Sequence, residues 1–216
     1  MKHLLLLILL FTGLTASAYD FVVGGVYYYA VSSDDKTCEV AQPLTTYIGN
    51  IVIPSEVVYN GKTWSVTSIG ASAFSDCSGL TGITIPNSVT SIGRNAFWGC
   101  SGLTSITIPN SVTNIGKFAF AYCSALENLV IEDGTGKLEV GDELFSSCPL
   151  KSLYLGRDLS CESSPFYGKS TLTEVIIGNT VTNIGNNAFE GCSGLTSIII
   201  PNSVTSIGRT AFNRCI

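Results

Sequence analysis

Hydrophobic residues recur along most of the chain in a short alternating pattern. In one copy, Leu80, Ile83 and Ile85 form a Leu-x-x-Ile-x-Ile segment that ends at Pro86-Asn87. Alternation of this kind is typical of a short strand with one buried face. Because proline donates no backbone hydrogen bond and Pro-Asn favours a turn, we expect each strand to end there and the chain to reverse.

The second half of each copy carries a different hydrophobic spacing. Val89 and Ile92 are followed by Gly93 and then by an Ala-Phe-x-x-Cys segment that runs from Ala96 to Cys100. This spacing predicts a short helical or 3-10 turn that packs inward through Ala, Phe and Cys. One copy cannot bury these residues alone. Copies should therefore stack, with a parallel sheet on one side and the turns on the other.

The copies are true repeats with a period of about 23 residues. Residues 83–103 and 106–126 are identical at 15 of 21 positions. Two copies are degenerate, and in the fifth Phe166 is followed by Lys169 where the other copies have cysteine. We expect Cys161, five residues before Phe166, to take the place of a core isoleucine in that copy.

The combined motif, IPxSVTxIGxxAFxxCxxLxxIxI, resembles the BspA-like class of leucine-rich repeats over about residues 51–216. The resemblance implies an α/β repeat fold, a right-handed curved leucine-rich-repeat solenoid. Members of this class are secreted or surface proteins, typical of Bacteroidetes, that are associated with adhesion to host matrix proteins, to bacteria or to epithelial surfaces. By this resemblance the chain is an adhesin-like binding protein, not an enzyme, that contacts a protein or glycan ligand noncovalently. The alternative is a structural spacer or assembly module of a longer surface protein.

The sequence divides into three parts, of which the first is residues 1–18. Residues 19–67 read as an N-terminal β cap with an irregular first repeat strand, and residues 68–216 as the repeats. Two-residue hairpin signals occur at Gly24-Gly25 and Asn60-Gly61, each between apolar strand patterns. A solenoid needs such a cap because its first hydrophobic layer would otherwise face water.

The last repeat is incomplete, since it stops at Ile216 without its Leu-x-x-Ile-x-Ile strand. Either the chain is a fragment of a longer array or this end meets a partner. An uncovered apolar layer with an exposed edge strand favours self-association.

Residues 1–18 have the pattern of a secretory signal peptide. Met1-Lys2-His3 is basic, residues 4–10 are apolar, and the small residues 16–18 suit cleavage after Ala18. The alternative is an N-terminal membrane anchor, but the apolar run is shorter than the roughly 20 residues that a spanning helix needs. We expect a secreted or cell-surface protein without a transmembrane segment.

Composition excludes several functions. Charged residues make up 12% of the chain and the formal net charge is −5, which disfavours binding to nucleic acid. The single histidine, His3, lies in the signal segment, so the mature chain would lack Ser-His-Asp and Cys-His catalysis and any zinc site that needs imidazole. We expect no cofactor and no metal site.

Six of the eight cysteines recur at one repeat position. They are Cys77, Cys100, Cys123, Cys148, Cys192 and Cys215. A fixed period suits a buried core position, so we expect free structural thiols. Disulfides between stacked repeats are the alternative, because neighbouring strands lie within the distance that a disulfide spans.

The strand pattern points to a candidate binding surface. The residue between the two inward isoleucines should point outward, and in successive copies this column reads Thr84, Thr107, Val130, Tyr154, Ile176 and Ile199. We call its last four members the sheet-face stripe. The neighbouring outward column is small or polar, and an apolar stripe with a polar border is typical of an interaction surface. The alternative is simple β propensity.

Two other groups are weaker candidates. Aromatic residues in or beside the turns form a candidate second patch of Trp98, Phe118, Tyr122 and Tyr167. An acidic cluster comprises Glu132, Asp133, Glu139, Asp142 and Glu143. We interpret the acidic cluster as a solvated loop, with weak calcium binding as the alternative, because it lacks the residue order of an EF-hand loop.

Overall fold

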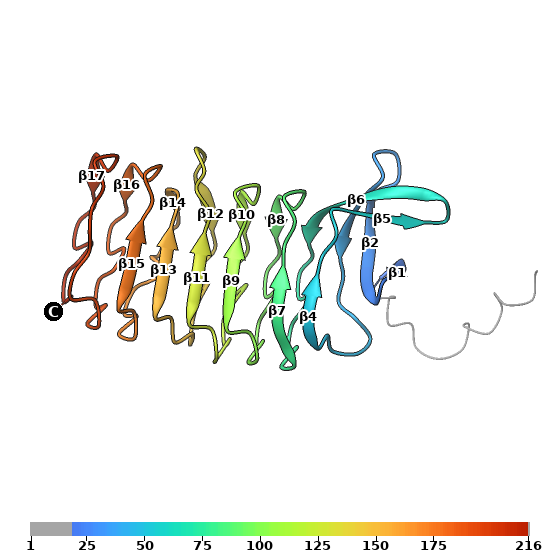
Figure 1. Ribbon diagram of the computed structural model, residues 1–216, viewed down its shortest axis with the longest axis horizontal. Coiled ribbons are helices and arrows are strands. Elements are labelled where there is room, and N and C mark those ends of the chain that lie inside the picture. Colours follow the sequence, from blue (N-terminus) through green and yellow to red (C-terminus); the bar gives the residue numbers. More distant parts are fainter. Residues whose placement is uncertain (1–18, 216) are drawn as a thin grey trace, which may run out of the picture.

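The chain forms a row of stacked repeats that begins with antiparallel strands at its N-terminal end (Figure 1). The computed structural model describes residues 19–215, and the signal peptide expected at residues 1–18 lies outside them. Successive repeats pair through parallel strands, so the expected leucine-rich-repeat solenoid is confirmed.

One side of the solenoid, which we call the wide sheet, is built from the predicted Leu-x-x-Ile-x-Ile strands. Inward residues such as Ile106, Leu129 and Leu153 are at most 2% exposed, whereas the residues between them face outward. Strands β9, β11, β13 and β15 form one parallel sheet, and β4 pairs with β7 beside it. The strands are β4 (Gly49–Val52), β7 (Leu80–Thr84), β9 (Ser105–Ile108), β11 (Asn128–Ile131), β13 (Ser152–Leu155) and β15 (Glu174–Ile177).

A second, narrow parallel ladder runs along the solenoid, and the sequence patterns did not predict it. Its strands are two or three residues long and contain the buried Ile92, Ile115 and Ile184. The ladder continues from the N-terminal strands to β14 and resumes at β16, without pairing between β14 and β16. Its members are β8 (Ser91–Ile92), β10 (Asn114–Ile115), β12 (Leu138–Val140), β14 (Leu159–Ser160), β16 (Asn183–Ile184) and β17 (Ser206–Ile207).

The Ala-Phe-x-x-Cys segments are stacked turns, and the expectation of helical or 3-10 turns is wrong. Residues 19–215 contain no helix, and hence none that could cross a membrane. Ala96 donates its amide hydrogen within its own turn, to the Gly93 carbonyl, but Phe97 donates to the Ala119 carbonyl of the next repeat. Because every second amide hydrogen bonds to the neighbouring repeat, the turn cannot continue as a helix. Asn95, with a φ of 55°, also leaves the right-handed region.

We number these turns along the chain. They are residues 70–77, 93–100, 116–123, 141–148, 162–169, 185–192 and 208–215, from the first turn to the seventh.

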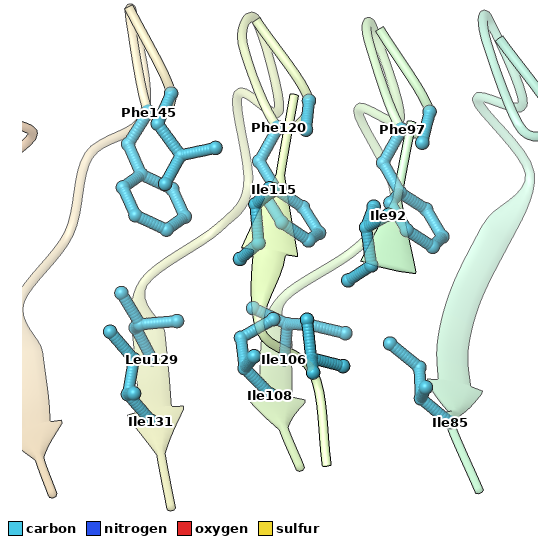
Figure 2. Packing of buried hydrophobic residues seen from close by; sticks show 14 of the residues in the cluster. Ile85, Ile92, Phe97, Ile106, Ile108, Ile115, Phe120, Leu129, Ile131 and Phe145 are labelled. Carbon is cyan, nitrogen blue, oxygen red and sulfur yellow. The ribbon is translucent and has the colours of Figure 1, made fainter. Parts of the chain in front are cut away.

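The turns and the wide sheet enclose a core that contains a ladder of phenylalanine rings. Phe97, Phe120 and Phe145 lie in one row and face the Ile and Leu side chains of the wide sheet (Figure 2). The Phe97 and Phe120 centroids lie 5.0 Å apart with the rings 3° from parallel. Phe97 and Phe120 are completely buried, so each ring is desolvated chiefly by the repeats on either side.

The repeated cysteines are free thiols, and all of them except Cys77 donate a hydrogen bond to the preceding turn. Cys100 Sγ donates to the Phe74 carbonyl at 3.0 Å, and Cys123 Sγ donates to the Phe97 carbonyl at 3.1 Å. In the fifth turn Lys169 Nζ makes the equivalent bond to the Phe145 carbonyl. The described residues contain no disulfide, which agrees with the expectation of structural thiols.

Cys161 does not take the place of a core isoleucine, so that expectation is wrong. Its side chain is exposed, because β14 ends at Ser160 and has no strand beside it in the sixth repeat. No strand of the sixth repeat therefore covers the Cys161 side chain.

The N-terminal strands pair around both predicted hairpin turns. β1 and β2 are antiparallel across Gly24-Gly25, and β5 and β6 are antiparallel across Asn60-Gly61. Phe21 is 4% exposed and stacks on Tyr59 with centroids 4.5 Å apart. The strands are β1 (Phe21–Val23), β2 (Val26–Ser32), β3 (Thr37–Val40), β5 (Glu56–Tyr59) and β6 (Lys62–Ile69).

Candidate functional site

The sheet-face stripe is one continuous row. Val130 pairs with Tyr154 and Tyr154 with Ile176 in register, and a parallel bridge joins Ile176 to Ile199. Val130, Ile176 and Ile199 are 37%, 50% and 86% exposed, while Tyr154 is partly exposed. The strands that carry the first three residues lie side by side in Figure 1.

The row has a further apolar member that the repeat alignment missed. Val52 on β4 pairs with Thr84 and is 61% exposed. The Ile51-Val52-Ile53-Pro54 segment matches Ile83-Thr84-Ile85-Pro86, and this match is the signal that could have identified it.

A polar column borders the stripe. Asn128 pairs with both Ser105 and Ser152, and the Ser152 hydroxyl donates to Asn128 Oδ1 at 2.7 Å. Glu174 continues this column on β15. A band of exposed apolar groups therefore lies beside a row of hydrogen-bonding groups on a rigid sheet.

Tyr154 is held by an acidic residue from the fourth repeat. Its hydroxyl donates to both carboxylate oxygens of Asp133, each at 2.9 Å, and this bond raises the pKa of Tyr154. Asp133 also accepts a hydrogen bond from the Thr180 hydroxyl at 3.3 Å. A Cβ on Gly178 would lie 2.5 Å from Asp133 Oδ1, so the small residue leaves room for this carboxylate.

The other acidic side chains make separate contacts with the neighbouring repeats. Asp142 forms a 2.6 Å ion pair with Lys117, which lowers the pKa of Asp142, and Glu132 accepts the amide hydrogen of Asn110 at 3.0 Å. Glu139 accepts from the side-chain amide of Asn114 at 3.3 Å. Residues 19–215 contain no group of three or more His, Cys, Asp and Glu side chains suited to a metal ion.

The structure divides the candidate aromatic patch into parts. Trp98 and Tyr122 pack together with centroids 5.4 Å apart, and the Arg94 guanidinium lies 5.9 Å from the Phe118 ring centroid. Tyr167 belongs to the fifth turn, two turns beyond Tyr122, and is 57% exposed. Phe118 and Tyr122 both have a left-handed φ, which is rare for aromatic residues.

Arg157 is a buried charged residue that sequence reasoning missed. It is 2% exposed, and its guanidinium donates to the carbonyls of Asn110 at 2.9 Å and Pro109 at 2.8 Å. Burial lowers the pKa of Arg157, and Glu132 opposes that shift. An arginine in the turn after β13, where three regular copies have asparagine after proline, is the only signal in the sequence. Its contacts fix the turn after β9 to the turn after β13.

A pocket of about 910 Å³ lies on the turn side, beside the degenerate fifth repeat. It is lined by parts of the fourth and fifth turns and by residues of the sixth repeat. Cys161, Tyr167 and Gly185 are among its exposed lining residues. Of these only Tyr167 was a predicted site residue, because gaps in stacking leave no mark on the hydrophobic pattern.

Solved structures of bacterial leucine-rich repeat proteins resemble this fold. The chain is 31% identical to a leucine-rich repeat protein from Bacteroides ovatus, with a TM-score of 0.69, over 92% of this chain and 51% of that one. It is 29% identical to a leucine rich cell surface protein from Faecalibacterium prausnitzii, with a TM-score of 0.65, over 90% of this chain and 52% of that one. A leucine-rich repeat protein of T. pallidum is 28% identical, with a TM-score of 0.68, over 88% and 86% of the two chains.

The chain thus spans about half the length of the first two of these proteins. No curated protein matches it. The family model of the BspA type leucine rich repeat region matches six copies, over residues 48–161 and 159–216. The repeat motif, the parallel strands and the stacked turns of this chain agree with that match. The chain belongs to the BspA type of leucine-rich repeat proteins.

Proposed function

We propose that the protein is a secreted or cell-surface binding module that recognises host or microbial macromolecules in the manner of an adhesin. The observation that carries this proposal is the in-register row of Val130, Tyr154, Ile176 and Ile199 on the outer face of the wide sheet. An exposed apolar row with a polar border suits a protein or glycan surface that buries the row and pairs with the border.

The architecture favours noncovalent recognition. The side chains beneath the stripe, such as Leu129, Leu153 and Val175, are buried in a continuous core, so the outward row is held rigidly. A rigid surface loses little conformational entropy when it binds. A surface location is supported by the signal pattern of residues 1–18 and by the cell surface relative from Faecalibacterium prausnitzii.

The test is binding of residues 19–216 to an immobilised panel of matrix proteins, mucins and bacterial surface glycans. A Tyr154→Glu, Ile176→Lys variant places two charges within the stripe. A matched Ser101→Glu, Ser193→Lys variant places the same charges at exposed turn positions. Circular dichroism checks that all three proteins fold.

We expect saturable binding by the parent and the turn variant, and at least tenfold weaker binding by the stripe variant, because the apolar contact surface would carry charges. Binding that survives in the folded stripe variant would move the site away from the stripe. No binding to any panel member would contradict the adhesin role.

A further inference from the structure

Regular turns are joined by a ladder of backbone hydrogen bonds. In the second turn the amides of Asn95, Phe97 and Gly99 donate to three carbonyls of the third turn. The first, third and sixth turns make the same three bonds to the turns that follow them. In a regular turn, every second amide therefore donates its hydrogen to the next turn.

The fourth turn departs from this rule. The corresponding amides belong to Glu143, Phe145 and Ser147, and none of them has a hydrogen-bond acceptor among the described residues. All three residues line the pocket on the turn side. Because backbone amides are strong donors that are normally satisfied, this wall of the pocket presents unused donors.

The fifth turn is bonded to the fourth turn only through side chains, from Lys169 to the carbonyls of Phe145 and Cys148 and from the Ser163 hydroxyl to Asp142 Oδ1 at 3.1 Å. To the sixth turn it also makes a backbone bond. The Ser164 hydroxyl donates to the Ala188 carbonyl at 2.7 Å, and the Gly168 amide donates to the Glu190 carbonyl at 2.7 Å. The Phe145 and Phe166 centroids are 6.1 Å apart, the widest step of the described phenylalanine ladder. The fourth and fifth turns therefore lack the three backbone bonds that join the regular turns.

The glycine that begins every turn except the fifth shows where the stacking is open. A Cβ on Gly93 would lie 2.6 Å from the Ala71 amide nitrogen, and one on Gly116 would lie 2.5 Å from that of Arg94. At Gly185 no atom lies within 4 Å of such a Cβ. The groove thus extends across the fifth turn, from the fourth turn to Gly185.

The lining of the groove is predominantly polar. Hydroxyl, amide and carboxylate groups come from serines, asparagines, Glu143 and Glu162, and the ring of Tyr167 is exposed among them. The apolar lining residues Leu144 and Phe145 are buried in the chain's own core. An adjoining apolar cavity, lined by Leu159, Pro165 and Ile184 among others, has a volume of about 40 Å³, so it admits no large peptide side chain. The charges are mixed, because Lys137 lies on the same lining as the two glutamates.

We propose that this groove binds a neutral oligosaccharide. Sugar hydroxyls both donate and accept hydrogen bonds, which suits unpaired amides beside carboxylates, and an exposed tyrosine offers a flat apolar surface to one face of a sugar ring. Mixed charge gives no preference for a polyanion. The inference rests on the proposed binding function and names a ligand class for a second surface.

The test compares two pairs of variants. Gly185→Trp fills the groove, and because Gly185 has open space and no left-handed φ, the backbone need not move, while Gly185→Ala leaves the groove open. Tyr167→Ala removes the exposed ring, and Tyr122→Ala removes a similarly exposed ring two turns away. The probes are a printed array of neutral N-glycan, O-glycan and bacterial oligosaccharides, followed by calorimetry with the tightest binder.

We expect Gly185→Trp and Tyr167→Ala to weaken binding of that oligosaccharide at least tenfold, and Gly185→Ala and Tyr122→Ala to change it less than twofold. Bound oligosaccharide should also slow modification of Cys161, which lies on the groove. No binding on the array, or binding unaffected by Gly185→Trp, would overturn the inference. A protein ligand lost in Gly185→Trp would reassign the groove to protein.

The two proposals can fail independently. The stripe variant Tyr154→Glu, Ile176→Lys should keep its oligosaccharide affinity, and Gly185→Trp should keep binding to any ligand of the wide sheet. Loss of oligosaccharide binding in the stripe variant would place that ligand on the wide sheet and overturn the groove.

Discussion

The Tyr154 hydroxyl donates a hydrogen bond to both carboxylate oxygens of Asp133, a residue 21 positions earlier in the chain. This contact joins the sheet-face stripe to the loop that follows β11. It fixes the orientation of the one aromatic ring in the stripe, so the ring need not be ordered when a ligand binds.

Removing the charge of Asp133 should lower the pKa of Tyr154. The carboxylate accepts the phenol hydrogen and repels a phenolate, so it raises that pKa above its ordinary value of 10.0. We expect Asp133→Asn to return it towards 10.0. The measurement is an NMR titration of ¹³C-labelled tyrosine, with Tyr154→Phe used to assign the resonance. An identical titration in Asp133→Asn would show that the hydrogen bond does not form in solution.

The phenylalanine ladder should dominate stability. Phe120 is fully buried and stacks on Phe97 and Phe145, so Phe120→Ala is expected to cost about 3 to 5 kcal/mol. Phe118 in the same turn is only partly buried and has a left-handed φ, so Phe118→Ala should cost less than about 1 kcal/mol. Urea unfolding of the two variants measures the difference. Equal losses would mean that burial in the ladder is not what stabilises the turn.

Cys161 should be the first thiol to react in the folded protein. It is exposed, whereas Cys100, Cys123 and Cys192 are fully buried and Cys215 is intermediate. We expect Ellman's reagent to label Cys161 fast and Cys215 more slowly, and the buried thiols only after unfolding, because the reagent must reach a thiolate. The Cys161→Ser variant should lose the fast phase. Fast labelling of a buried cysteine would contradict the observed stacking.

Stability should fall as the pH rises from 9 to 11. Burial raises the pKa of Cys38 and of Cys192 to about 11 from an ordinary 9.0, so between these values the unfolded chain binds fewer protons than the native one. The expected loss is on the order of 2 kcal/mol per thiol. Burial lowers the pKa of Lys169, so this residue acts in the opposite direction and reduces the total loss of stability. Urea unfolding at several pH values gives the slope of the free energy of unfolding against pH. Cys38→Ala should make that slope less steep.

Lys169 should stabilise the fifth turn through its hydrogen bonds. Its ammonium donates to the carbonyls of Phe145 and Cys148, so Lys169→Met leaves both without this donor and should cost about 1 to 3 kcal/mol. Lys169→Cys restores the residue of the other copies, and its thiol can donate to the Phe145 carbonyl. We therefore expect Lys169→Cys to be the more stable variant in thermal unfolding. The reverse order would assign the role of Lys169 to packing of its aliphatic chain.

Much of the wide sheet could be predicted, because an alternating pattern that repeats every 23 residues allows only one register between neighbouring strands. If Ile106 and Leu129 both point inward, then Thr107 and Val130 must point outward and become neighbours. The row of the stripe follows from this relation alone. The turns could not be predicted in the same way, because Ala96, Phe97 and Cys100 have the spacing of a helix whether their amides bond within the turn or to the next repeat.

The sequence by itself therefore determined the repeats, the parallel stacking and the inward or outward direction of each strand residue, since these depend on short-range periodicity. Only the tertiary structure decided the exposure of Cys161, the bond between Tyr154 and Asp133, and the groove beside Gly185. In the irregular fourth and fifth repeats these features depend on whether a neighbouring backbone lies within hydrogen-bonding distance. The spacing from Cys123 to Cys148 and from Cys148 to Lys169 departs from 23 residues, but this departure does not show where the backbone lies.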